Sequence, residues 1–340
     1  MFGIMVVSAA LSSCLSNTGT AACLMPVVLG ICAAAKIPAS RQLMPLAYAA
    51  GIGGGFLLGG GPPQIFFFCG TPPNIIVSGV LTSFGYESFS FFEFAWIGIP
   101  LTFVVIAYMM FIGKYLLPKA ELDADQEIEQ EIEATVTDSK KQIVSGLILA
   151  VCIIVMALDL KAISLEMTAI VGALVCVLTG CLTEKQAYSA IDWVTIFLFA
   201  GMMPVSAAMD KTGAGKLIAE WAVSLMGGSP TPIIMTSVLF IISCTLTQFM
   251  SNTAACALLA PVGVAISQQL GASPKAVLMA IGVAASCAFA TPVGTPPCTL
   301  VLGPGGYKFM DYVKVGVPLV ILCFIVSIIV IPMVWPFFPG

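Results

Sequence analysis

Charged side chains are scarce in this chain of 340 residues. Asp, Glu, Lys and Arg make up 9% of it, apolar residues make up 59%, and the mean hydropathy is +1.06. Because soluble domains carry about a quarter charged residues, the composition excludes a soluble enzyme, a disordered chain, a secreted disulfide scaffold and a nucleic-acid-binding protein. It is typical of an all-α polytopic membrane protein, whose surroundings are the lipid bilayer.

Histidine is absent, and Arg41 is the sole arginine. The commonest general base, metal ligand and physiological-pH switch is therefore missing. The 12 cysteines form no Cys-x-x-Cys motif and lie mostly in apolar runs, where cysteine acts as a small buried hydrophobe. No carboxylate is expected in the middle of a span, which argues against an intramembrane protease or metalloenzyme. We therefore expect no enzymatic activity.

Long uncharged stretches are present instead, at 1–35, 42–86 and 221–274. A helix needs about 20 apolar residues to span a bilayer. Regular spans are expected over 92–113, 143–160, 164–182, 192–209 and 312–337. Two further spans, 42–80 and 275–303, are interrupted by Gly-x-Pro-Pro clusters, since proline blocks the continuation of a helix. Unwound backbone at membrane depth is tolerated only where protein or a water-filled cavity surrounds it.

The strongest pattern is an internal repeat. Residues 16–27 read SNTGTAACLMPV and residues 251–262 read SNTAACALLAPV, at an offset of 235. In both copies an apolar arm leads to Ser-Asn-Thr, a second arm follows, and a helix broken at Gly-x-Pro-Pro comes next. Paired interrupted hydrophobic segments of this kind indicate a transporter binding site.

The two copies are expected to be inverted in the membrane. If 1–35 and 221–274 are re-entrant hairpins, the five spans between them give the second hairpin the opposite orientation. The positive-inside rule then places the following basic residues in the cytoplasm: Lys36, Arg41, Lys114, Lys119, Lys140, Lys141, Lys185, Lys308 and Lys314. In this layout the acidic loop at 118–142 is cytoplasmic, and the C-terminus is extracytoplasmic at the plasma (inner) membrane.

A Ser-Asn-Thr tip at the start of a helix can serve both cations and anions. Hydroxyl and carboxamide oxygens, with carbonyls freed at a helix break, suit Na⁺. The Asn NH₂ group, free backbone N–H groups and the positive end of the helix dipole suit a carboxylate or another oxyanion. Ser, Asn and Thr also cap ordinary helices, but two copies in register, each before a Pro-Pro break, favour a binding site.

These motifs resemble the divalent anion/sodium symporter family of the ion transporter superfamily. The resemblance rests on the two tips, on Met25-Pro26-Val27, and on the segment from Thr291 to Pro297 followed by Val301-Leu302-Gly303. It implies an elevator-type transporter, usually a homodimer, that imports a small di- or tricarboxylate or sulfate with co-bound Na⁺. Family members have several helices before the first hairpin, so the chain is expected to be shortened at its N-terminus.

The resemblance also implies the binding residues. Those expected to hold Na⁺, partly through backbone carbonyls, are Ser16, Asn17, Gly70, Asn74, Ser251, Asn252 and Gly294. Those expected to face the substrate are Asn17, Thr18, Thr71, Pro72, Asn252, Thr253, Thr295 and Pro296. Pro-Pro occurs twice in the first broken helix, at 62–63 and 72–73, and the second copy is preferred narrowly. Cys298 stands where the family has Asn after Pro-Pro.

The expected parts follow from the repeat. The transport part comprises 1–80 and 211–303, and the remaining parts are a scaffold span at 81–117, the loop at 118–142, further spans at 143–210 and a C-terminal span at 304–340. Three alternatives stay open: a sodium-independent anion exchanger, an arsenite-type permease, and a fragment that does not transport alone. The sequence leaves the anion, the choice between Na⁺ and H⁺, and the stoichiometry undecided.

Overall fold

The computed structural model describes residues 1–56, 71–90, 92–118, 139–157, 165–189 and 231–338, with isolated residues between 191 and 227. Every regular element in these residues is helical. The first repeat contains α1 (Phe2–Cys14), α2 (Asn17–Ala35), η1 (Ala39–Arg41), α3 (Leu43–Gly53), η2 (Gly54–Phe56) and α4 (Pro72–Ser83). The second repeat contains α13 (Pro232–Thr247), α14 (Asn252–Leu270), α15 (Pro274–Ser286) and α16 (Pro296–Leu302).

The remaining helices lie between and after the repeats. They are α5 (Ala95–Tyr108), η3 (Met109–Gly113), α6 (Lys114–Leu116), α8 (Ser139–Ala157), α9 (Leu165–Leu178), α10 (Glu184–Ser189) and α17 (Phe309–Val334). Most of residues 192–209, where a span is expected, lie outside the described residues, as does most of the acidic loop.

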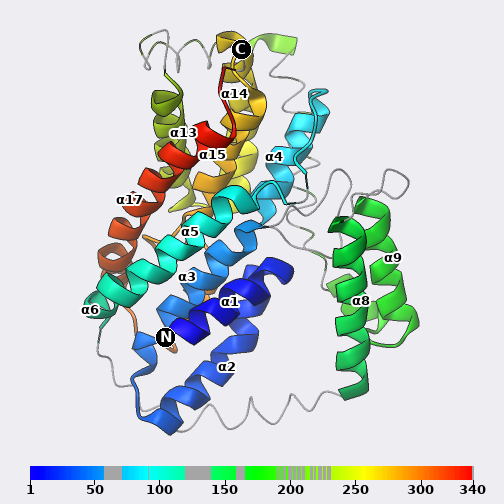
Figure 1. Ribbon diagram of the computed structural model, residues 1–340, viewed down its shortest axis with the longest axis vertical. Helices are drawn as coiled ribbons and strands as arrows, with labels where there is room; N and C mark the ends of the chain where they lie inside the picture. The colour runs from blue at the N-terminus through cyan, green and yellow to red at the C-terminus, as the bar shows by residue number, and fades with distance from the viewer. Residues whose placement is uncertain are drawn as a thin grey trace.

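Each repeat begins with a pair of helices joined by a short tip. In Figure 1 the α1–α2 pair lies in the lower half of the molecule and the α13–α14 pair in the upper half. In each pair the first helix packs against the first half of its own broken helix, α1 on α3 and α13 on α15. A hydroxyl forms a hydrogen bond across each contact, at positions related by the repeat offset. Ser8 Oγ donates to the Leu46 carbonyl at 3.1 Å, and Ser243 Oγ donates to the Ile281 carbonyl at 2.9 Å.

The second halves of the broken helices are exchanged between the repeats. α4 of the first repeat packs against α14 and α15, whereas α16 of the second repeat packs against α2 and α3. The Sγ atom of Cys256 on α14 donates to the carbonyl of Pro73 on α4 at 3.5 Å. We call residues 54–71 the first break, of which the structure describes 54–56 and 71, and residues 287–295 the second break. The exchange brings Thr71 and Phe289 to the contact between the repeats, where they bond Ser286 and Tyr48.

Helices α5 and α17 pack on the repeats. α5 contacts α1, α3 and α17, and α17 also contacts α13 and α15. Tyr108 of α5 donates its hydroxyl to the Val315 carbonyl of α17 at 2.8 Å. α5 lies in residues 81–117, the part that we expect in the scaffold, and it packs on α1 and α3 of the first repeat. α8 and α9 pack chiefly against each other and stand to one side in Figure 1.

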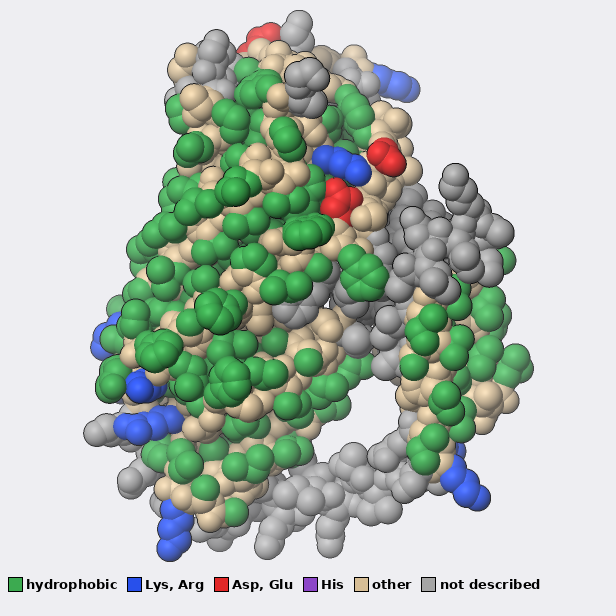
Figure 2. All heavy atoms as spheres, in the orientation of Figure 1, with side chains coloured by type: hydrophobic (Ala, Val, Ile, Leu, Met, Phe, Trp, Pro, Cys, Tyr) green, Lys and Arg blue, Asp and Glu red, His purple; other side chains and the backbone are tan. Residues whose placement is uncertain are grey.

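The outer surface suits a lipid environment. Among the described residues, four helical segments are long and apolar enough to cross a membrane, namely Asn17–Ala35, Ala95–Leu116, Asn252–Leu270 and Phe309–Val334. Large apolar side chains such as Phe103, Phe111 and Met333 are exposed on these helices. Figure 2 shows hydrophobic side chains over most of the described part of the visible face, with charged side chains toward its upper and lower ends.

Candidate ion and substrate site

The first tip begins a helix whose foremost amide groups are free. Ser16 caps α2, because its Oγ accepts from the N–H of Gly19 at 3.0 Å and its carbonyl accepts from Thr20 at 2.9 Å. The N–H groups of Asn17 and Thr18 then have no partner within the helix. Both residues are partly exposed. The tip can therefore present two backbone donors and the Thr18 hydroxyl to a ligand.

The second tip is built in the same way. Ser251 caps α14, its Oγ accepting from Ala254 at 3.2 Å and its carbonyl from Ala255 at 3.0 Å. The N–H groups of Asn252 and Thr253 are left without a partner in the helix. Within the described part of the chain, the hydroxyls of Thr18 and Thr253 make no hydrogen bond, so both are available.

Behind the first tip, three oxygen atoms converge around one proton. Ser12 Oγ lies 2.9 Å from Asn17 Oδ1 and 2.6 Å from the Ala50 carbonyl of α3. A hydroxyl has a single proton, so it cannot donate to both oxygens at once. The Asn17 Nδ2 atom donates to the Gly51 carbonyl at 3.1 Å. One hydrogen of this NH₂ group is thus used within the protein. The other is left for the substrate that Asn17 is expected to face.

The same arrangement stands behind the second tip, exactly one repeat offset later. Thr247 Oγ1 lies 2.6 Å from Asn252 Oδ1 and 2.8 Å from the Ala285 carbonyl of α15. We call the oxygens of Ser12, Asn17 and Ala50 the first oxygen cluster, and those of Thr247, Asn252 and Ala285 the second oxygen cluster. Ser12 and Thr247 were missed from the sequence, although each is a hydroxyl residue five positions before the Asn of its tip.

The first break closes against the first tip. The N–H of Thr71 donates to the Gly54 carbonyl at 3.0 Å, and a Cβ placed on Gly54 would lie 2.1 Å from Asn17 Oδ1. The Thr71 hydroxyl lies 3.2 Å from that of Ser286 on α15, so it links the first break to the second repeat. Asn74 is buried in the first turn of α4. Gly70 and the earlier Pro-Pro pair at 62–63 lie outside the described residues.

The second break closes against the second tip. A Cβ on Gly294 would lie 2.6 Å from the Thr247 carbonyl, so glycine is needed for this close approach. Thr295 is buried and precedes α16, whereas Pro296 is exposed at the start of that helix. Cys298 is buried, and its carbonyl accepts from the hydroxyl of Tyr312 at 2.7 Å.

The proline pairs decide which helices can donate to an anion. α4 begins with Pro72-Pro73 and α16 with Pro296-Pro297, and proline has no N–H. The next amides are already used, because Asn74 donates to the Thr71 carbonyl and Cys298 to the Thr295 carbonyl. Of the four helices that begin near the tips and breaks, α2 and α14 are therefore the ones whose first turns offer unpaired backbone donors.

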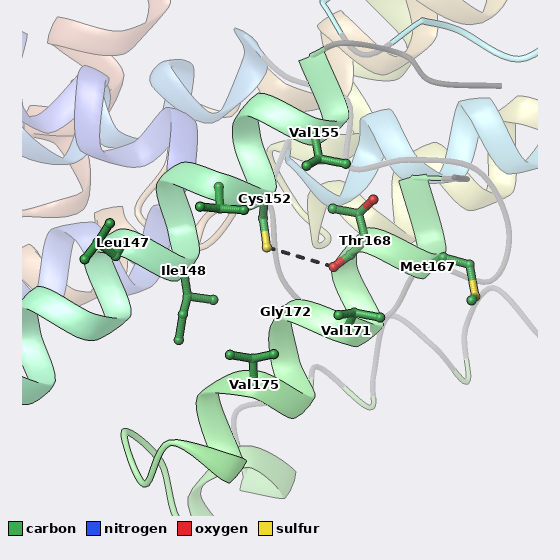
Figure 3. Close-up of a pocket in the computed structure, with 10 residues that line it drawn as sticks. Leu147, Ile148, Cys152, Val155, Met167, Thr168, Val171, Gly172 and Val175 are labelled. Carbon is green, nitrogen blue, oxygen red and sulfur yellow. Dashed lines mark hydrogen bonds between the residues drawn. The ribbon is translucent and has the colours of Figure 1, made fainter. Parts of the chain in front are cut away.

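Charged and metal-binding side chains are not part of this arrangement. Residues 42–86 and 221–274 carry no charge, and the described residues hold no group of His, Cys, Asp or Glu suited to a metal ion. A cavity of about 510 Å³ lies elsewhere, between α8 and α9 (Figure 3). Its lining is almost wholly apolar, including Leu147, Val151 and Val171, so it does not suit an anion.

Comparison with known proteins gives the family. A family model described as "Citrate transporter" (CitMHS) matches residues 1–163 and 151–338. The chain belongs to the citrate transporter family. The family-level prediction from the motifs is thereby confirmed, and the protein is a multi-pass membrane protein of a transporter family rather than an enzyme.

Three relatives of this citrate transporter family member are transporters of bacteria. An uncharacterized transporter of Haemophilus influenzae is 32% identical over 342 residues, which cover 95% of this chain and 70% of the relative. The uncharacterized transporter YfbS of Escherichia coli is 42% identical over 171 residues, 49% of this chain but only 28% of YfbS. The sodium-dependent dicarboxylate transporter SdcS of Staphylococcus aureus is 25% identical over 376 residues, covering this whole chain and 70% of SdcS.

A solved structure shares the fold. The YdaH transporter of Alcanivorax borkumensis superposes with a TM-score of 0.67 at 17% identity, over 98% of this chain and 77% of that chain. The all-helical, multi-span architecture expected from the composition is thereby confirmed.

Proposed function

We propose that this secondary transporter imports a small divalent anion, a di- or tricarboxylate or sulfate, together with Na⁺. The two oxygen clusters are the observation on which the proposal rests. In each, a hydroxyl oxygen lies 2.6 to 2.9 Å from a carboxamide oxygen and from a backbone carbonyl oxygen. Uncharged oxygen ligands of this kind suit a hard cation, and their recurrence in both repeats favours two sodium sites.

The same geometry suits an anion between the tips. α2 and α14 each direct two unpaired N–H groups and a helix-dipole end outward from an Asn-Thr pair. Since no arginine or lysine lies in 42–86 or 221–274, bound Na⁺ would supply the positive charge that offsets the anion. Thr18, Thr253, Thr71 and Thr295 are the side chains we assign to the substrate. The printed name of SdcS, a sodium-dependent dicarboxylate transporter, supports both assignments.

We further propose an inverted repeat and an elevator mechanism. The exchange of α4 and α16 binds the two hairpins into one body, which can move only as a unit. α5 and α17 pack on that body and are assigned to it, whereas α8 and α9 belong to the static part. The predicted homodimer, the cytoplasmic acidic loop and the extracytoplasmic C-terminus remain part of this proposal, since neither orientation nor assembly follows from the packing.

The test is uptake of radiolabelled succinate, citrate and sulfate into liposomes containing purified protein, with an inward Na⁺ gradient or with choline in place of Na⁺. We expect accumulation of one anion class with Na⁺ and none with choline. Gly54→Ala should abolish it, because the new Cβ displaces Asn17 Oδ1, whereas Gly55→Ala is the matched control, since nothing lies within 4 Å of a Cβ there.

The other outcomes are equally informative. Exchange that is insensitive to choline would replace the symporter with a sodium-independent exchanger. Arsenite flux would favour the permease. Equal uptake by the Gly54→Ala and Gly55→Ala proteins would remove the first oxygen cluster from the mechanism. Absence of flux would refute transport by this chain alone, and because the chain covers 70% of the length of SdcS, the longer form would be assayed next.

A further inference from the structure

The second break is held from three sides by groups that the proposed function does not use. It runs between α13, α3 and α17. A Cβ on Gly316 of α17 would lie 2.0 Å from the Phe289 carbonyl, so the α17 backbone approaches the break directly. The break also carries Gly294, which packs against the backbone carbonyl of Thr247, the residue whose hydroxyl belongs to the second oxygen cluster. Its position therefore fixes the surroundings of that cluster.

Gln248 ties the break to the tip. This side chain is buried and follows Thr247 directly. Its Nε2 donates to the carbonyls of Cys244 at 2.9 Å and Cys287 at 3.2 Å, and its Oε1 accepts from the N–H of Ala290 at 3.0 Å. The hydroxyl of Thr291 in turn donates to the Gln248 carbonyl at 2.6 Å. One residue thus bonds backbone groups of both the hairpin and the unwound segment.

Tyr48 ties the break to the other repeat. It lies fully buried on α3 and donates its hydroxyl to the Phe289 carbonyl at 2.7 Å. Its ring packs against Phe289 and Tyr312, with centroids 5.1 and 6.5 Å away. Two residues further along α3, the Ala50 carbonyl belongs to the first oxygen cluster. Tyr48 therefore connects the helix that bears one cluster to the break that borders the other.

We propose that Gln248 and Tyr48 are positioning residues of the second sodium site, holding the second break so that this site is preformed. The inference rests on the proposed function and adds residues that contact neither ion nor anion. Loosening the break separates Gly294 and Ala285 from Thr247 before Na⁺ can bind. Sodium affinity is then lowered, whereas the rate of uptake at saturating Na⁺ is retained.

The test compares Tyr48→Phe and Gln248→Leu with Thr236→Val. Thr236→Val is the matched control, because it also deletes one buried hydroxyl, which donates to the Pro232 carbonyl at the far end of α13 from the second break. We expect the Na⁺ concentration for half-maximal uptake to rise about tenfold in Tyr48→Phe, the loss typical of one buried hydrogen bond, and further in Gln248→Leu, which loses three. The control should keep the wild-type value, and maximal rates should be similar in all.

A second readout needs no transport. Hydrogen–deuterium exchange should increase in residues 287–295 of Tyr48→Phe and Gln248→Leu and stay unchanged there in Thr236→Val. Equal changes in all three variants, or a lower melting temperature without a change in sodium dependence, would refute positioning. If wild-type uptake does not depend on Na⁺, the proposed coupling is wrong. The hydrogen–deuterium exchange of residues 287–295 then still decides whether Gln248 and Tyr48 hold the second break. If Gln248→Leu does not fold, the test relies on Tyr48→Phe, which is the milder change because it removes a single oxygen atom.

Discussion

The two repeats agree at their tips and differ at their breaks. At the tips, the hydroxyl, carboxamide and capping contacts recur at the offset of 235, residue for residue. At the breaks, 18 residues (54–71) separate α3 from α4, whereas 9 residues (287–295) separate α15 from α16. The parts that we assign to Na⁺ are thus duplicated faithfully, and the connections between them are not.

The side chains around the breaks show the same contrast. The counterpart of Gln248 in the first repeat is Ser13, whose hydroxyl donates to the Ala10 carbonyl of its own helix at 2.7 Å. The counterpart of Tyr48 in the second repeat is Val283, which has no hydroxyl. If both oxygen clusters bind the same ion, both need the same ligand atoms. Each break, in contrast, needs only to be held in place. Different side chains can fix that position, so the breaks are free to differ.

The largest effect should come from the carboxamides, and it should be equal in the two repeats. Asn17→Ala and Asn252→Ala each remove the Oδ1 atom around which a cluster forms. We expect uptake by either variant to fall to that of protein-free liposomes. Size-exclusion profiles identical to wild type would show that folding is retained. Wild-type uptake by one variant alone would break the equivalence and remove that repeat from the site.

A smaller and again equal effect is expected from the hydroxyls. Ser12→Ala and Thr247→Val each leave two of the three oxygens in place. The Na⁺ concentration for half-maximal uptake should rise about tenfold in both, as for the loss of one hydrogen-bonding group. Ser8→Ala and Ser243→Ala are the matched controls, because these hydroxyls lie one turn earlier on the same arms and bond only carbonyls. If the controls shift sodium affinity equally, Ser12 and Thr247 serve packing alone.

The tips could be predicted from the sequence because the Ser-Asn-Thr motif occurs once in each repeat. Ser-Asn-Thr in an apolar chain is costly to bury without partners, so its recurrence indicates a function. The same reasoning applies to Ser8, Ser12, Ser243 and Thr247, polar residues one helical turn apart on apolar arms. Ser12 and Thr247 were missed because serine in the first repeat corresponds to threonine in the second, so the two positions are not identical.

The second break could not be predicted in the same way. Gln248 and Tyr48 occur in one repeat only, so no internal comparison marks them. The contact of Tyr48 with the Phe289 carbonyl joins residues 241 positions apart, and nothing local in the sequence specifies it. The packing of α5 against α1 and α17 also depends on the tertiary arrangement, which no local pattern in residues 81–117 specifies.

The smallest effect should distinguish the positions after the two Pro-Pro pairs. Asn74 and Cys298 occupy them, and both side chains are buried. In the second repeat the Cys298 carbonyl accepts from Tyr312, a contact that alanine retains. Cys298→Ala should therefore change uptake less than about twofold, within the range of mild core substitutions, whereas Asn74→Ala should reduce it further. Both are measured as initial uptake at saturating Na⁺. Equal loss in the two variants would mean that the Cys298 thiol contributes to the second site, and that the repeats correspond at the breaks more closely than their lengths indicate.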